Sequence, residues 1–127
     1  MRIIPSDKFD IEACKSLSVA SDEEVVPYIS ELLECLQDFN WPIATPVSDR
    51  LSVLGKELVN PIKEILKSTD EIWKYWIVSR FLYKVDRMVI VGLMEELKRV
   101  EAQPTDSEIK EEVYAEVCKL LIERKNA

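Results

Sequence analysis

Glu24-Val-Val-Pro-Tyr-Ile-Ser-Glu-Leu-Leu33 and Glu57-Leu-Val-Asn-Pro-Ile-Lys-Glu-Ile-Leu66 are two segments of one chain that repeat the same text. Both carry Glu, Val, Glu and Leu at the same spacing, with a proline early in the segment. A second match, at an offset of 31 residues, pairs apolar positions throughout: Val47 with Val78, Leu51 with Leu82, Leu54 with Val85, Leu58 with Val89, Val59 with Ile90, Ile62 with Leu93 and Leu66 with Leu97. Any two amphipathic helices align somewhere, but the shared letters favour a genuine repeat over coincidence.

The apolar residues recur every three to four positions through most of the chain, which is typical of amphipathic helices. Each repeat unit is then one helical hairpin that needs its neighbours to bury both of its faces. We therefore predict an all-α protein of about seven helices, arranged as an α-α superhelix in a single domain over residues 1–127. Hairpins are expected at about 7–38, 42–67 and 70–102, followed by a terminal helix at 106–124.

The expected helix starts follow from capping residues. Ser6 is expected to cap the first helix, and Ser21 with Glu24 has the pattern of a capping box. Pro42 suits the first position of the third helix. Gly92 lies inside the sixth helix, where glycine costs about 1 kcal/mol relative to alanine. We expect Gly92 to leave room for an aromatic ring of the preceding helix.

The helix–Gly–helix unit with an early proline resembles HEAT and armadillo repeats over about residues 21–100. Two strings, Leu36-Gln-Asp-Phe-Asn-Trp-Pro-Ile-Ala44 and Ile72-Trp-Lys-Tyr-Trp-Ile77, look like the signature strings of a family of short bacterial HEAT-like proteins of unassigned function. That resemblance covers nearly the whole chain. It implies an α-α superhelix of helical hairpins and no known activity.

Composition and charge exclude several classes of function. The chain has 127 residues, with 24 acidic and 17 basic side chains and a net charge of −7. A nucleic-acid-binding protein usually carries a basic excess, so we expect no nucleic-acid partner. The longest apolar run, residues 88–94, is far shorter than the ~20 residues that span a bilayer. We expect no membrane association, and three widely spaced cysteines fit a cytoplasmic protein better than a disulfide framework.

Catalytic and metal-binding patterns are not found in the sequence. There is no histidine and no Cys-x-x-Cys pair, so the usual zinc site is excluded. The acidic clusters lie mostly at expected helix starts, where carboxylates stabilise the helix dipole. Cys14, Cys35 and Cys118 each neighbour an apolar stripe and are expected in the core. We predict no metal, no cofactor and no catalytic residue, and hence a protein that is not an enzyme.

The middle of the chain is the best candidate for a binding surface. Residues 41–85 hold all three tryptophans and seven basic against five acidic side chains, whereas both flanking regions are net acidic. Tryptophan and arginine are frequent anchors of protein interfaces. The candidate surface is expected to combine a turn with one helix, through the residues Asp38, Asn40, Trp41, Trp73, Lys74, Trp76 and Arg80. The competing interpretation is that the aromatic side chains are core and that Asp38 and Asn40 only shape their turn.

We therefore expect a non-enzymatic cytoplasmic module that binds a protein or peptide. A more specific form of this hypothesis is a neutraliser of a basic protein. Small acidic proteins are steered onto basic targets, which supports that version. Two alternatives stay open: a small carboxylate-dependent hydrolase, and a small-molecule sensor with a pocket near Trp73 and Trp76. A hydrolase needs two converging acids, and a sensor needs an apolar pocket. The sequence specifies neither the partner nor the oligomeric state.

Overall fold

The computed structural model describes residues 2–125, and helices are the only regular structure in that part of the chain. The α-helices are α1 (Ile11–Val19), α2 (Asp22–Val25), α3 (Ile29–Leu33), α4 (Ala44–Ser52), α5 (Val59–Lys67), α6 (Glu71–Ser79), α7 (Arg87–Ala102), α8 (Asp106–Lys110) and α9 (Val113–Lys125). Short 3₁₀ turns continue several of them: η1 (Val26–Tyr28), η2 (Glu34–Leu36), η3 (Lys56–Leu58) and η4 (Phe81–Tyr83). The prediction of an all-α fold is confirmed.

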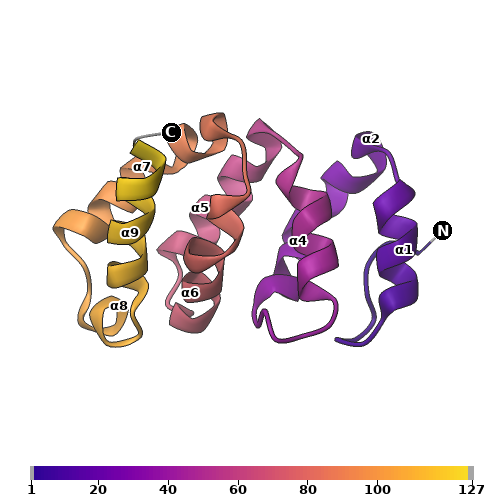
Figure 1. Cartoon of the computed structure of the whole chain (residues 1–127), viewed down its shortest axis with the longest axis horizontal. Helices are drawn as coiled ribbons and strands as arrows, with labels where there is room; N and C mark the ends of the chain where they lie inside the picture. Colours follow the sequence, from indigo (N-terminus) through magenta and orange to yellow (C-terminus); the bar gives the residue numbers. More distant parts are fainter. Residues whose placement is uncertain (1, 126–127) are drawn as a thin grey trace.

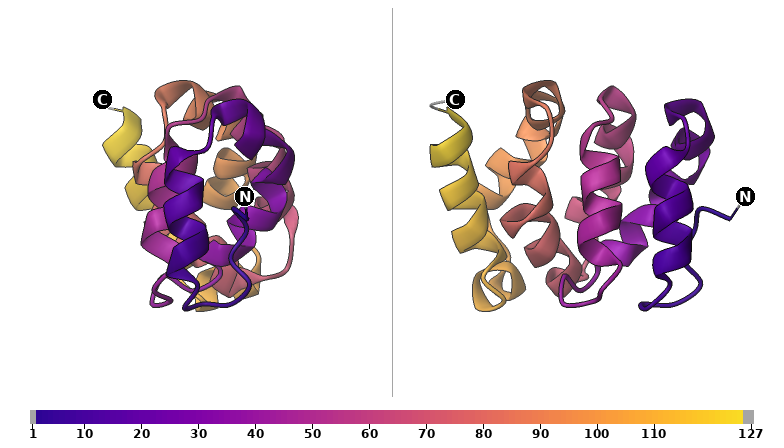
Figure 2. Two further views of the ribbon diagram at one scale, coloured as in Figure 1. Left: turned by 90° about the vertical axis from the view of Figure 1, so that its right-hand side faces the viewer. Right: turned by 45° about the vertical axis from the view of Figure 1, so that its right-hand side comes forward.

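The helices stand side by side in a row, with α1 at one end and α9 at the other (Figure 1). The oblique view in Figure 2 shows successive up-and-down pairs along this row. α1 packs on α4, α5 on α7, and α9 on both α6 and α7. The last contacts join helices that are distant in sequence, and they close one end of the row.

The repeated text has the same burial in both copies. Val25, Ile29, Leu32 and Leu33 are buried, and so are their counterparts in the second copy, Leu58, Ile62, Ile65 and Leu66. Each large aliphatic side chain removed from water contributes roughly 1.5–3 kcal/mol. The repeat therefore marks the positions through which neighbouring helices stabilise one another.

Two helices begin at residues other than those expected from the sequence. α1 begins at Ile11 and is capped by Asp10, whose carboxylate accepts a hydrogen bond from the Ala13 amide at 3.2 Å. Ser6 is not the cap: its amide donates to the same Asp10 carboxylate at 2.9 Å. α4 begins at Ala44 rather than at Pro42. The capping box of Ser21 and Glu24 is confirmed.

Two expected helices are interrupted. The segment from Ser21 to Leu36 is divided into α2, η1, α3 and η2, and Pro27, which has no amide hydrogen to donate, lies in the first interruption, η1. The terminal helix is divided between α8 and α9 at Glu112, whose φ of 67° lies in the left-handed region. No described helix is both long and apolar enough to cross a membrane.

Gly92 marks a close approach, but to a different helix from the one expected. A Cβ atom at this position would lie 2.8 Å from Cγ2 and 3.1 Å from Cγ1 of Val59 on α5. The expectation that Gly92 makes room for a ring of α6 is therefore wrong. Its missing side chain instead lets α7 pack closely on α5.

We expect Gly92→Leu to lower the free energy of unfolding by about 1–3 kcal/mol, because the new side chain overpacks the α5–α7 contact. Chemical denaturation followed by circular dichroism measures the change. Val59→Ala removes the two methyl groups in the way, so the double variant should lose less stability than the two single losses added together. Strict additivity, or an unchanged Gly92→Leu variant, would place the contact elsewhere.

Candidate functional site

The Asp38–Trp41 turn and α6 meet through an aromatic stack. The rings of Phe39 and Trp76 are 5.8 Å apart between centroids and inclined by 26°. The guanidinium carbon of Arg80 lies 5.6 Å from the Trp76 ring, in the geometry of a cation–π contact. Arg80 and Asn40 are exposed, and Phe39 and Trp76 are half-buried. We call these four residues the aromatic turn surface.

The turn that carries Phe39 is built by Asp38. Its carboxylate accepts a hydrogen bond from the Asn40 amide at 2.8 Å, and its backbone carbonyl accepts one from the Trp41 amide at 3.1 Å. Such side-chain-to-backbone bonds are a usual way of fixing a turn. Asp38 and Asn40 thus shape the turn, which in turn sets the Phe39 ring on Trp76.

The other two tryptophans pack against the hydrophobic core. The Nε1–H of Trp73 donates to the Leu33 carbonyl at 3.1 Å and ties α6 to α3. Trp73 lines a hollow of about 190 Å³ with Pro61 and Ser30, whereas Trp41 lines a separate hollow with Ile4 and Cys35. Of the predicted tryptophans, only Trp76 belongs to the aromatic turn surface.

Lys74 is not the surface cation that the sequence analysis expects. Its side chain is 3% exposed, and its ammonium group bonds Glu71 Oε1 and Glu108 Oε2, each at 2.7 Å. The Ser68 carbonyl accepts the third bond at 3.1 Å. Lys74 therefore lies inside the protein and is withdrawn from the candidate binding surface.

Arg99 completes a buried ion-pair cluster, which we define as Glu71, Lys74, Arg99 and Glu108. The guanidinium donates to both oxygens of Glu108, at 2.6 and 2.9 Å. The Thr105 amide donates to Glu108 at 2.8 Å, and the two residues form the capping box of α8. Two carboxylates face two cations within the cluster, and a third carboxylate, Glu96, lies 3.8 Å from Arg99 at its edge.

Glu108 is held in its ionised form. Burial alone raises the pKa of this carboxyl, but the hydrogen bonds from Arg99, Lys74 and the Thr105 amide outweigh that effect and lower the pKa to about 2. A general acid requires the opposite shift. Glu108 is therefore unsuited to donate a proton, and its bonds instead hold α6, α7 and α8 together.

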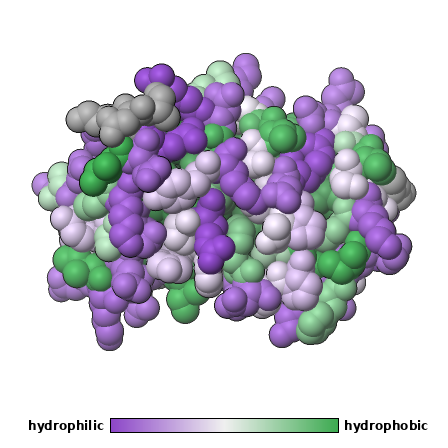
Figure 3. Space-filling view, in the orientation of Figure 1, coloured by the Kyte–Doolittle hydropathy of each residue, from purple (hydrophilic) through white to green (hydrophobic). Residues whose placement is uncertain are grey.

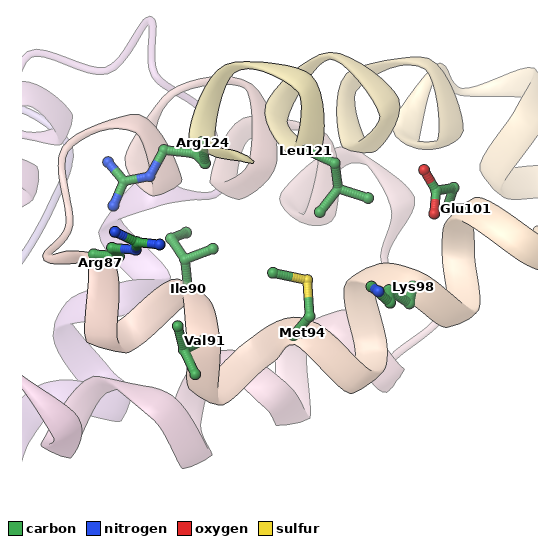
Figure 4. A pocket seen from close by; sticks show the side chains of 8 residues that line it. All are labelled: Arg87, Ile90, Val91, Met94, Lys98, Glu101, Leu121 and Arg124. Carbon is green, nitrogen blue, oxygen red and sulfur yellow. The ribbon is translucent and has the colours of Figure 1, made fainter. Parts of the chain in front are cut away.

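A groove between α7 and α9 was missed by the sequence analysis (Figure 4). It has a volume of about 320 Å³ and an apolar lining of Ile90, Val91, Met94 and Leu121. Arg87 and Arg124 lie at one end, and Lys98 and Glu101 at the other. The available signal was the sixth helix, which is apolar nearly all round at its start and therefore has more apolar surface than one neighbour covers.

The chain belongs to a family described as a domain of unknown function, DUF5071, which matches residues 3–121. No curated protein matches the chain. The expectation of a family of unassigned function is confirmed.

Among the described residues, no group of three or more acidic or cysteine side chains is arranged to hold a metal ion.

We expect Lys74→Met to lower the free energy of unfolding by about 3–5 kcal/mol, because Glu71 and Glu108 then lose a buried cation. Thermal or urea unfolding measures the loss. Lys119→Met is the matched control: Lys119 pairs with Glu116 but is 67% exposed, so its loss should change stability by less than about 0.5 kcal/mol. Equal effects of the two substitutions would contradict the buried cluster.

The stability of the protein should also depend on the ionisation of Glu108. Because the folded pKa lies below the ordinary value of 4.5, the stabilisation is present above about pH 4.5 and is lost as the pH falls towards 2. The full effect is about 3 kcal/mol. Urea unfolding between pH 6 and pH 2 should therefore show that the free energy of unfolding falls less steeply with pH for Glu108→Gln than for the unmodified protein. Parallel curves would remove Glu108 as a source of the acid sensitivity.

Proposed function

We propose that this member of the DUF5071 family is a non-enzymatic binding module that holds a protein partner at the aromatic turn surface. The observation that carries the proposal is the stack of Phe39, Trp76 and Arg80, which joins two chain segments at the protein surface. Trp and Arg are the residue types most enriched among the energetically dominant contacts of interfaces.

The stack supports binding because its side chains are already ordered. The Trp76 ring is stacked on Phe39 and also makes a T-shaped contact with Tyr75, with 5.2 Å between the ring centroids. Ordering a long side chain on binding costs about 0.5–1.5 kcal/mol. Because the Trp76 ring is already held in place, little of this conformational entropy would be lost when a partner covers it. Arg80 adds a charged donor beside the ring.

The partner's charge follows from the surroundings of the stack. Residues 1–40, which include Phe39 and Asn40, carry nine acidic and three basic side chains, whereas residues 41–85, which include Trp76 and Arg80, carry five acidic and seven basic ones. The face shown in Figure 3 is largely hydrophilic, with hydrophobic residues in small separate groups. A mixed surface in an acidic chain suits a partner with a basic rim and a polar contact zone. A neutraliser of a basic protein is the specific form of this proposal.

The reactive groups of the chain support a binding role better than a hydrolytic one. The oxygens of the buried carboxylates Glu71 and Glu108 are occupied by bonds to Lys74, and those of Glu108 also by bonds to Arg99. Burial, followed by the charges of Cys14 and Glu34, raises the pKa of Cys35 to about 11. A thiol with such a pKa is protonated near neutral pH and is a poor nucleophile. Buried free thiols at Cys14 and Cys35 also suit the reducing cytoplasm in which we place the module.

We expect Arg80→Glu to remove the partner while the fold is retained, because the Arg80 side chain is exposed and, among the described residues, interacts only with the Trp76 ring. Affinity capture from the native cytosol, quantified by mass spectrometry, identifies proteins whose recovery depends on Arg80. With the purified partner, association should slow by about tenfold or more and weaken as salt rises.

Lys15→Glu is the matched control for charge reversal. Lys15 is exposed on α1 and pairs only with its neighbour Glu12, so the variant should recover the same partner at the same rate. If both variants recover every protein equally, the aromatic turn surface is not the binding site.

A further inference from the structure

We infer that the groove between α7 and α9 is a second site, which binds a small monocarboxylate with an apolar body of about eight carbons. This goes beyond the proposed function, because the groove shares no residue with the aromatic turn surface. The carboxylate is assigned to the end that carries Arg87 and Arg124, and the apolar body to the lining between the two helices (Figure 4).

The two arginines form the anion-binding end. Arg87 comes from the start of α7 and Arg124 from the end of α9, yet their guanidinium groups face the same end of the groove in Figure 4. Arg87 forms no ion pair with any described residue. Arg124 donates one N–H to the Val85 carbonyl at 2.9 Å.

A polar atom in this place lacks a partner. The Nε of Arg124 is buried and has no hydrogen-bond acceptor among the described residues. Buried donors in native proteins are nearly always satisfied, and each exception calls for an explanation. Because this Nε is itself out of reach of solvent, a carboxylate in the groove would bond the terminal N–H groups of the two arginines, whose planar forks match its two oxygens.

The rest of the groove determines what is attached to the carboxylate. Its lining is aliphatic or thioether: Ile90, Val91, Met94 and Leu121. Methionine adapts its shape to different apolar ligands. Val91 is 62% exposed, so a ligand would cover apolar surface that is now in contact with water.

The size of the groove limits the ligand. A volume of about 320 Å³ holds about ten non-hydrogen atoms if each takes the roughly 30 Å³ of a liquid water molecule. Eight carbons and two carboxylate oxygens fill that space. Lys98 and Glu101 offset one another in charge at the opposite end, so only the arginine end has a net positive charge, which argues for a monocarboxylate rather than a dicarboxylate or a nucleotide.

The test is a titration of the ¹⁵N-labelled chain with octanoate, followed by amide chemical shifts and by calorimetry. We expect saturable shifts at residues 87–98 and 120–124. Octanamide, which has the same body and no charge, should bind about tenfold or more weakly. Shifts spread over the whole chain, equal binding of octanamide, or no saturation by about 5 mM octanoate would overturn the proposal.

Variants separate binding in the groove from a general effect of positive charge. Arg87→Gln removes an arginine that holds nothing in the fold, and it should weaken octanoate binding by about tenfold or more. Lys15→Gln is the matched control outside the groove: Lys15 is exposed on α1, at the other end of the row of helices, so the variant should leave octanoate binding unchanged. Equal loss in both variants would indicate a general effect of positive charge and would refute the site. Tighter binding of a peptide that ends in leucine than of octanoate would also refute a small-acid ligand.

Discussion

The carboxylate of Glu108 connects the C-terminal third of the protein. It is fully buried, and it accepts hydrogen bonds from Lys74 on α6, from Arg99 on α7 and from the Thr105 amide at the start of its own helix. Three segments are therefore fixed to one side chain. A buried charge is tolerated only when its hydrogen-bonding capacity is filled. This requirement makes the relative placement of α6, α7 and α8 more restrictive than hydrophobic contact alone, which is non-directional.

The position of α9 depends on this arrangement. α8 is only five residues long, and an isolated helix of that length is not stable in water. Its capping box and the buried cluster hold it in place, and the chain then reverses at Glu112 to begin α9. α9 packs on both α6 and α7. The buried ion-pair cluster thus helps to position α9 alongside α7, and the groove with its two arginines lies between these two helices.

The helices and most buried positions were predictable because the repeated text encodes them directly. The 3.6-residue period and the shared apolar positions report which side of each helix is covered. Lys74 was wrongly expected at the surface because sequence patterns report only nearby residues. Its partner Glu108 lies 34 residues further along the chain. The spacing of Glu71 and Lys74 was visible in the sequence but fits an exposed ion pair equally well. Gly92 was correctly expected at a close contact, but only the packing of α5 on α7 identifies Val59 as its neighbour.

The two proposed sites are held in place by different interactions. The aromatic turn surface joins a loop to α6, and the loop is shaped by local bonds to Asp38. The groove joins α7 to α9, which are positioned by packing and by the buried cluster. A ligand that brings Arg87 and Arg124 onto one carboxylate would add a bond between these helices. Since α6 packs on α9 as well, that contact offers a direct route for coupling between the sites, and the free energy of such coupling must be the same in both directions.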